Sequence, residues 1–242
     1  MIEKTATIED VAEHAGVSIA TVSRALHKPQ VVSEKTRKKV QTAIAVTGYT
    51  ANVMARNLRL NRSGMILLLV PDIGNPFFSA ILSGIEQGAS KAGYNVLIGD
   101  TQNEPEREAT YAAYLRSNQA DGMILLNGRL PAPLANTPRG VTPPVVIACE
   151  RIPGCNLPTV IIDNEKAAYI ATRHLQEFGH TRIAHIAGPA SNILTTDRAA
   201  GYQRALAEAD IKTNSSLVYG ADFSIEAGIK AARALLNDAP NR

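Results

Sequence analysis

The segment from Thr7 to Leu26 constrains the fold of this 242-residue chain more than any other feature. Its first half places apolar side chains at the spacing of one helix face, namely at Ile8, Val11, Ala12 and Ala15. Thr7 and Asp10 form the capping-box pattern that begins a helix, and Gly16 suits the left-handed conformation that ends one. Ser18 is then placed to cap a second helix. Two short helices joined by a tight glycine turn predict a helix-turn-helix, whose second helix enters the major groove of DNA.

The second predicted helix divides into a packing face and a face suited to DNA. Val22, Ala25 and Leu26 point toward the first helix. On the other face, small apolar side chains can contact a thymine methyl group, and Arg24 can donate two hydrogen bonds to guanine or hold a phosphate. Hydroxyl groups at a helix start can also hold phosphates. The candidate DNA-binding residues are Thr7, Ser18, Ile19, Ala20, Thr21, Ser23, Arg24 and His27. The alternative is a structural helical hairpin with a solvated arginine.

The charge of the chain is distributed unevenly. A third helix is expected from the cap Ser33 to Thr47, with Gly48 as its end, and basic residues crowd its exposed side. Residues 1–62 hold 10 Lys and Arg against 5 Asp and Glu, a net charge of +5, whereas the remainder holds 15 against 17, a net charge of −2. A small basic head on a slightly acidic body favours nucleic-acid binding over a merely solvated charged face.

Four segments together resemble the LacI/GalR family of bacterial transcriptional regulators: Thr7–Leu26, Val32–Val40, Gly48–Tyr49 and Asn52–Arg59. The resemblance covers essentially the whole chain. It implies a DNA-binding transcriptional regulator, a repressor, that binds a pseudo-palindromic operator in double-stranded DNA as a homodimer. It also implies control by a small-molecule effector, such as the nucleoside cytidine or a sugar. The alternative is a solute- or nucleoside-binding protein without DNA function, against which the basic head argues.

The same resemblance assigns residues 52–60 as a hinge helix that orders on operator DNA and lies in the minor groove. A leucine at the position of Leu58 wedges into the central base step, which kinks the duplex. The implied DNA contacts are Asn52, Ala55, Arg56 and Leu58, with Asn57 beside them. The family often has proline where Ala51 stands, so the hinge geometry is expected to be less fixed. Without the resemblance, a plain linker is the simpler interpretation.

After residue 63 the pattern changes to strands alternating with helices. Met65–Val70 is a continuous apolar run, typical of a strand buried on both faces. Strands are expected at residues 65–70, 95–99, 122–126 and 144–148, with helices at 78–92 and 104–117. A second set has strands at 160–162, 183–187 and 217–219, with helices at 164–178, 197–209 and 225–236. Residues 130–144 hold five of the 13 prolines and are expected to form a loop. This alternation implies parallel sheets covered on both sides.

The expected fold is therefore an all-α helix-turn-helix head-piece followed by an α/β domain. That domain consists of two doubly wound parallel-sheet lobes and resembles the periplasmic-binding-protein-like effector domain of the family. The expected parts are residues 1–50 for DNA binding, 51–62 for the hinge helix and linker, 63–158 for the first lobe and 159–242 for the second. Because the family usually continues further, we expect an incomplete second lobe and poor effector binding, or none, by this chain.

Ligands of doubly wound sheets bind at the carboxyl ends of the strands. The loops after the expected strands bring together aromatic rings that can stack on a planar ring, and polar groups that can bind hydroxyls. By resemblance, the candidate effector-binding residues are Phe77, Phe78, Asp163, Asn192, Arg198 and Phe223. Either phenylalanine of the adjacent pair could instead belong to the core. Asp163 and Asn164 could serve only to cap the following helix.

The sequence disfavours several other classes of protein. No apolar run approaches the roughly 20 residues of a membrane span, and the first residues lack the apolar core of a secretion signal. We therefore expect a cytoplasmic protein. Cys149 and Cys155 are the only cysteines and have no metal-ligand spacing, so no metal or cofactor is expected. No nucleophile elbow, P-loop or dinucleotide fingerprint follows a strand, so we expect no enzyme.

Overall fold

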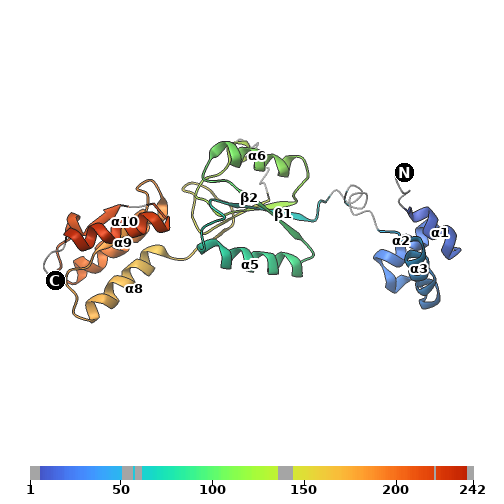
Figure 1. The fold of residues 1–242 in the computed structure, drawn as a ribbon, viewed down its shortest axis with the longest axis horizontal. Helices are drawn as coiled ribbons and strands as arrows, with labels where there is room; N and C mark the ends of the chain where they lie inside the picture. Colours follow the sequence, from blue (N-terminus) through green and yellow to red (C-terminus); the bar gives the residue numbers. More distant parts are fainter. Residues whose placement is uncertain (1–5, 51–56, 58–61, 136–143, 221, 239–242) are drawn as a thin grey trace. The chain divides into compact units, whose positions relative to one another are not determined.

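The computed structural model describes residues 6–50, 57, 62–135, 144–220 and 222–238. The chain divides into two compact units, Met1–Asn61 and Arg62–Arg242 (Figure 1). Among the described residues, no helix is both long enough and apolar enough to cross a membrane.

The N-terminal unit is the predicted helix-turn-helix followed by a third helix. Its elements are α1 (Ile8–Ala15), α2 (Ile19–His27), the short 3₁₀ helix η1 (Pro29–Val31) and α3 (Glu34–Thr47). Thr7 and Asp10 make both bonds of the capping box: Asp10 Oδ2 accepts from Thr7 N at 2.7 Å, and Thr7 Oγ1 accepts from Asp10 N at 3.4 Å. Gly16 ends α1 in the left-handed conformation. The buried core consists of Val11, Ala12, Ala15, Val22, Val40 and Ala43.

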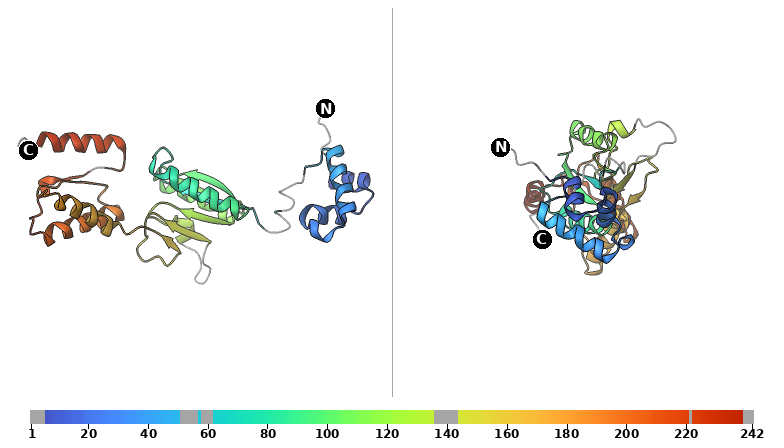
Figure 2. Two further views of the ribbon diagram at one scale, coloured as in Figure 1. Left: turned by 90° about the horizontal axis from the view of Figure 1, so that it is seen from below. Right: turned by 90° about the vertical axis from the view of Figure 1, so that its right-hand side faces the viewer.

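The second unit begins with a five-stranded parallel sheet in the order β2-β1-β3-β4-β5. The strands are β1 (Met65–Val70), β2 (Asn95–Asp100), β3 (Gly122–Leu125), β4 (Val145–Ala148) and β5 (Thr159–Val160). Its helices are α5 (Phe77–Lys91), α6 (Pro105–Arg116) and the short α7 (Ala132–Ala135). Figures 1 and 2 show α5 and α6 on opposite faces of the sheet.

The apolar run of β1 builds a core on both faces of this sheet. Side chains alternate between the faces of a strand, so Leu67 and Leu69 join one buried cluster with Ala112 of α6, whereas Leu68 joins another with Phe78 of α5. The apolar run of β1 therefore contributes buried side chains to both faces, as the sequence predicts for a parallel sheet covered on both sides.

The described residues of the second part of this unit form a parallel pair of strands, three α-helices and one short 3₁₀ helix. The strands are β6 (His185–Ala187) and β7 (Val218–Gly220), and the helical elements are α8 (Asn164–Glu177), α9 (Ile193–Glu208), η2 (Ser215–Leu217) and α10 (Ile225–Asp238). Tyr202 of α9 is buried, and its hydroxyl donates to the carbonyl of Ile183 at 2.8 Å. Arg204 of α9 pairs with Glu165 of α8 at 2.6 Å, so the two helices are joined at the surface as well.

Three details differ from the sequence-based expectations. The strand expected at residues 160–162 does not open a second sheet: Val160 pairs with Ala148 of β4, because an apolar run specifies a strand but not its partner. The proline-rich stretch 130–144 contains α7. Helix α9 begins at Ile193 rather than near residue 197, because Asn192 caps it by accepting from Leu194 N.

A carboxylate at the start of β3 fixes the residues that lead into β1. Oxygens of Asp121 accept from Ser63 N at 2.6 Å, from the Ser63 hydroxyl at 3.0 Å and from Gly64 N at 2.9 Å. Partial burial acts to raise the pKa of Asp121, but these hydrogen bonds and the nearby Arg62 outweigh it, and the pKa lies below its usual value of 3.8.

We expect the substitution Asp121→Asn to destabilise the second unit by about 1–2 kcal/mol at pH 7, because a charged acceptor of three hydrogen bonds is lost. A carboxylate whose pKa is lowered on folding stabilises the protein above its unfolded pKa, and this contribution disappears as pH falls through the folded pKa. Urea unfolding should therefore show a difference in the free energy of unfolding between wild type and variant that is smaller at pH 3 than at pH 7. A difference that persists unchanged at pH 3, or one matched by the exposed control Glu86→Gln, would contradict this assignment.

Candidate functional site

The second helix of the helix-turn-helix presents the predicted recognition face to solvent. Ile19 is 46% exposed although it is a large apolar residue, and Ala20 and Arg24 are also exposed, whereas Val22 on the opposite face is fully buried. The Nε atom of Arg24 donates to the Ala20 carbonyl at 3.1 Å, which holds the arginine stem along the helix. An apolar side chain and a guanidinium displayed together suit the edges of base pairs.

The predicted phosphate-binding hydroxyls lie at the helix starts. Ser18 caps α2 by accepting from Thr21 N at 3.2 Å, and the Ser18 and Thr21 hydroxyls lie 2.9 Å apart. The Thr7 hydroxyl donates to Asp10 Oδ2 at 2.9 Å. Ser23 is half-buried, and His27 is the exposed last residue of α2. In the structure, Thr7 and Ser18 therefore cap the N-termini of α1 and α2. A helix N-terminus is a favourable place for a phosphate.

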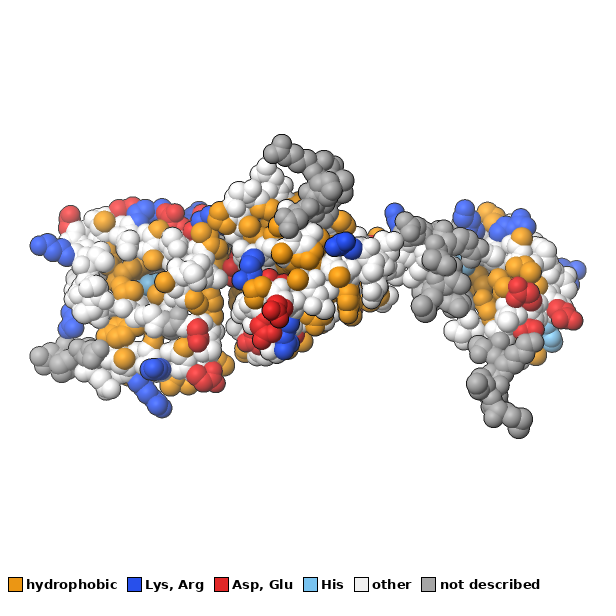
Figure 3. Space-filling model, turned by 90° about the horizontal axis from the view of Figure 1, so that it is seen from above, with side chains coloured by type: hydrophobic (Ala, Val, Ile, Leu, Met, Phe, Trp, Pro, Cys, Tyr) orange, Lys and Arg blue, Asp and Glu red, His pale blue; other side chains and the backbone are white. Residues whose placement is uncertain are grey.

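Basic side chains are also exposed on α3. Lys38 and Lys39 are exposed, Arg37 is half-buried, and Lys38 pairs with Glu34 of the same helix at 3.1 Å. Figure 3 shows Lys and Arg side chains on the surface of this unit. The predicted hinge contacts Asn52, Ala55, Arg56 and Leu58 lie outside the described residues.

We expect the substitution Thr7→Ala to destabilise α1 by about 1 kcal/mol, because the first turn loses its side-chain acceptor. Amide hydrogen exchange of Val11 and Ala12 in the intact chain measures this effect directly. Thr42→Ala is the matched control, because Thr42 lies within α3, is exposed and caps no helix. Equal protection in wild type and the Thr7 variant would show that the capping box contributes nothing.

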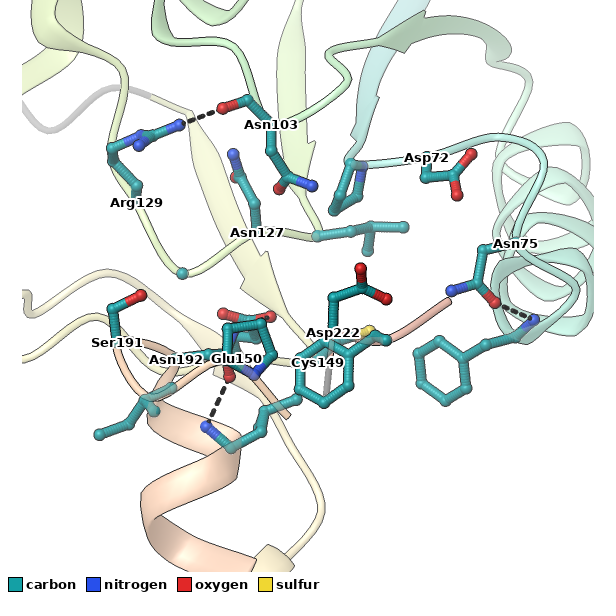
Figure 4. Close-up of a pocket in the computed structure, with 18 of the residues that line it drawn as sticks. Asp72, Asn75, Asn103, Asn127, Arg129, Cys149, Glu150, Ser191, Asn192 and Asp222 are labelled. Carbon is teal, nitrogen blue, oxygen red and sulfur yellow. Dashed lines mark hydrogen bonds between the residues drawn. The ribbon is translucent and has the colours of Figure 1, made fainter. Parts of the chain in front are cut away.

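The second unit contains a cavity of about 1030 Å³ at the carboxyl ends of its strands. Its walls come from the loops after β1, β3 and β4 on one side, and from the start of α9 and the segment after β7 on the other (Figure 4). The strand order reverses direction between β1 and β3, and ligands bind at such a switch point in open α/β sheets. A cavity therefore lies where the strand-end rule predicts a ligand site.

The two adjacent phenylalanines play different parts in this wall. Phe77 is 54% exposed, whereas Phe78 is 8% exposed and packs in the core with Leu68 and Leu126. Both line the cavity, and their rings meet edge to face with centroids 5.1 Å apart. The core interpretation is thus confirmed for Phe78, and Phe77 offers a free ring face.

Three other predicted residues come together on the opposite wall, where Asn192, Arg198 and Phe223 all line the cavity. The Arg198 guanidinium lies over the Phe223 ring, 5.8 Å from its centroid, and its Nε donates to Asn164 Oδ1 at 2.9 Å. The structure places Asp163 elsewhere: it caps α8 by accepting from Lys166 N and does not line the cavity. Asn164 is buried at the first turn of the same helix.

Sequence reasoning missed several cavity residues that follow β3 and β4: Asn127, Arg129, Cys149, Glu150 and Arg151. Asn192, the cap of α9, donates to Glu150 Oε1 at 3.1 Å, and Arg151 pairs with Asp197 at 2.7 Å, so the loop after β4 contacts the start of α9 directly. Both strands were expected, and the rule that ligands bind beyond strand ends would have found these residues had it been applied to them. Burial, and to a lesser extent the negative charge of Glu150, raise the pKa of the Cys149 thiol, which lowers its thiolate fraction at neutral pH.

No group of three or more metal-ligating side chains occurs in the part of the chain that the structure describes. The chemistry of the cavity is that of hydrogen bonding and stacking: amides, carboxylates, three arginines and exposed aromatic rings. Such a set can hold a polar, ring-containing molecule.

Two protein-family models match the chain along nearly its whole length. Residues 7–52 match the bacterial regulatory proteins of the lacI family, and residues 63–241 match the periplasmic binding proteins and sugar binding domain of the LacI family. These ranges agree with the division into a helical N-terminal unit and an α/β unit.

Individual relatives give the same result. The HTH-type transcriptional repressor CytR of Escherichia coli (strain K12) is 45% identical over 97% of this chain and 69% of its own length. The ribose operon repressor of Halalkalibacterium halodurans is 39% identical over 97% of this chain and 69% of its own length. Within the family, the sequence itself looks most like the cytidine repressor, as indicated by residues 70–79, 97–100, 157–164 and 186–189. The match to CytR agrees with this likeness.

Solved structures extend the likeness to the fold. The lac repressor dimer bound to operator and the anti-inducer ONPF has a TM-score of 0.82 at 27% identity, over 98% of this chain and 71% of that one. The transcriptional regulator CelR in complex with cellobiose has a TM-score of 0.65 at 32% identity, over 97% of this chain and 71% of that one.

Proposed function

The chain belongs to the lacI family of bacterial regulatory proteins and is a DNA-binding transcriptional regulator rather than an enzyme, and we propose how its residues carry out that function. In this proposal it represses transcription in the cytoplasm, where its DNA target lies. The observation that carries the proposal is the face of α2 that displays Ile19, Ala20 and Arg24 while Val22 is buried.

Arg24, Ile19 and Ala20 contact the base edges in the major groove. The helix-start hydroxyls and neighbouring polar side chains hold phosphates and fix the orientation on the duplex, namely Thr7, Ser18, Thr21, Ser23 and His27. The hinge residues Asn52, Ala55, Arg56 and Leu58 contact the minor groove, with Leu58 as the wedge that bends it. A homodimer places two such helices about one helical turn apart, so the operator is an inverted repeat. The lac repressor, which shares this fold, is bound to its operator as a dimer.

The sequence led us to expect poor effector binding, but residues of this chain line a cavity in the second unit. We therefore infer that this cavity holds the effector, and a nucleoside fits its chemistry better than a simple sugar. Exposed Phe77 offers a ring face for a planar base, and Phe223 with Arg198 offers a second. Asn192 and Glu150 supply partners for ribose hydroxyls. The complex of CelR with cellobiose makes a sugar the competing class.

Effector binding acts on DNA binding through the lobes that share the cavity. A ligand that prefers one arrangement of the loops after β4 against α9 shifts that equilibrium. Contacts that would change include Arg151–Asp197 and Asn192–Glu150. The hydrogen bonds from Ser63 N and Gly64 N to Asp121 join the sheet to the segment that follows the hinge residues in sequence.

Selection of duplexes from a random pool by the intact chain tests this function. We expect enrichment of an inverted repeat whose half-sites lie about one helical turn apart. Adding a panel of nucleosides and sugars to the bound duplex then identifies the effector class by release or tightening. Recovery of unenriched duplexes would contradict sequence recognition. A response to sugars alone would contradict the nucleoside assignment and leave DNA recognition standing.

A further inference from the structure

A buried carboxylate behind the cavity wall has no role in the function proposed above. Glu108 lies on α6, its side chain is 1% exposed, and it does not itself line the cavity. It accepts three hydrogen bonds: from Arg129 Nη2 at 2.8 Å, from Arg129 Nε at 2.9 Å and from Asn127 Nδ2 at 2.5 Å. Arg129 also donates to the carbonyl of Asn103 at 3.0 Å (Figure 4).

Glu108 forms an ion pair with Arg129. Both carboxylate oxygens meet the guanidinium in the two-bond geometry that is the strongest form of this ion pair. The hydrogen bond from Arg129 to Glu108 raises the pKa of the arginine further above its usual value. An ionised carboxylate accepts hydrogen bonds and donates none. Glu108 is therefore an acceptor for whatever lies against it.

This fixes the orientation of the Asn127 side chain. Because Glu108 can only accept, the amide NH₂ of Asn127 must face it, and the amide oxygen must point away. Asn127 is 5% exposed, and its Oδ1 has no hydrogen-bond partner among the described residues. Buried acceptors are nearly always satisfied in native proteins. Asn127 also lines the cavity, beside Asn103 and Arg129.

We propose that Glu108 is a positioning residue for effector specificity: it holds the Asn127 carbonyl toward the cavity, so that the site selects ligands presenting an N–H donor there. The inference rests on the proposed nucleoside site and names its specificity. Bases that carry an amino group should bind more tightly than bases of the same shape that carry an oxo group. Cytidine should exceed uridine, and adenosine should exceed inosine, within whichever pair the cavity accepts.

The substitution Glu108→Gln tests the proposal without a large change in shape. Asn127 and Arg129 Nη2 share one oxygen of Glu108, and Arg129 Nε bonds the other. A glutamine can keep its oxygen on Arg129 Nε and give up the Nη2 bond, so that its NH₂ group donates to the Asn127 carbonyl. Asn127 would then turn its own NH₂ group toward the cavity and favour the oxo partner of each pair. Asn127→Leu removes the acceptor and leaves the Glu108–Arg129 pair in place. Glu106→Gln is the matched control, because Glu106 is an exposed glutamate on the same helix.

Calorimetric titration of the intact chain with the four nucleosides gives the result. We expect wild type and the Glu106 variant to prefer the amino member about tenfold, as one hydrogen bond allows. The preference should vanish in Asn127→Leu and vanish or reverse in Glu108→Gln. Equal affinity for both members in wild type, or a preference that Glu108→Gln leaves unchanged, would overturn the proposal.

A second readout needs no ligand. The Asn127 side-chain amide gives a proton–nitrogen NMR signal, which is assigned by its loss in Asn127→Leu. We expect this signal to be protected from exchange in wild type and to shift in Glu108→Gln but not in Glu106→Gln. An unprotected signal that ignores residue 108 would overturn the positioning role. The Asn127 amide signal could be protected and shift in Glu108→Gln while no nucleoside binds to wild type. That result would contradict a nucleoside as the effector and leave the positioning role of Glu108 standing.

Discussion

Replacing Arg24 with alanine should lower affinity for the preferred duplex by about 5- to 150-fold, which corresponds to about 1–3 kcal/mol. Affinity for a shuffled duplex of the same composition should fall much less. The physical reason is the position of Arg24 on the exposed face of α2, with its stem held by the Ala20 carbonyl and the opposite face anchored by buried Val22. A guanidinium held in this way can donate two parallel hydrogen bonds to one guanine.

Fluorescence anisotropy with both duplexes distinguishes base reading from a phosphate contact. Lys39→Ala is the control, because it removes the same charge from an exposed position of α3 and should weaken both duplexes to a similar extent. An equal loss on both duplexes for Arg24→Ala would assign Arg24 to the phosphate backbone. An unchanged affinity on both would remove Arg24 from the interface.

Replacing Gly201 with alanine should destabilise the second unit by about 3 kcal/mol or more, at the upper end of the range for overpacking. Gly201 is buried on α9 where that helix meets α8. A Cβ atom there would lie 2.0 Å from the Glu165 carbonyl oxygen and 2.9 Å from the backbone nitrogen of Tyr169. These neighbours are backbone atoms of another helix, so a rotamer change cannot relieve the contact and the helices must separate.

Gly228→Ala provides the matched control for this prediction. Gly228 lies in α10, and a Cβ atom at that position meets nothing within 4 Å. Alanine there should stabilise the chain by about 0.4–1 kcal/mol, because the unfolded state loses conformational freedom. Urea unfolding of the two variants should therefore move in opposite directions. A Gly201 variant as stable as wild type would show that α8 and α9 are less closely packed than the structure has them.

Local rules account for the parts of the fold that sequence reasoning predicted well. The capping residues Thr7, Ser18 and Ser33 and the helix-ending glycines Gly16 and Gly48 act within one or two turns of chain, and each is found in its predicted place. Signals of this kind depend on neighbours in sequence, so they survive whatever the tertiary structure does.

Features that depend on partners distant in sequence were harder to predict. The apolar run at residues 160–162 indicates a strand, but only pairing with β4 shows which sheet it joins. An aspartate at the position of Asp163 suits either a ligand contact or a helix cap, and the structure shows that it caps α8. Glu108 lies on α6 and Asn127 lies 19 residues further on, in the loop after β3, so their hydrogen bond follows from the packing of α6 against β3.

The affinity of the intact chain for three duplexes tests the central claim most directly. The duplexes are the selected inverted repeat, one half-site alone and a shuffled sequence, each measured at about 0.15 M salt, where non-specific phosphate contacts are partly screened. A sequence-specific dimeric regulator should bind the inverted repeat at least about 10³-fold more tightly than the shuffled duplex, with the half-site far weaker than the repeat. Equal affinity for all three duplexes would contradict the account.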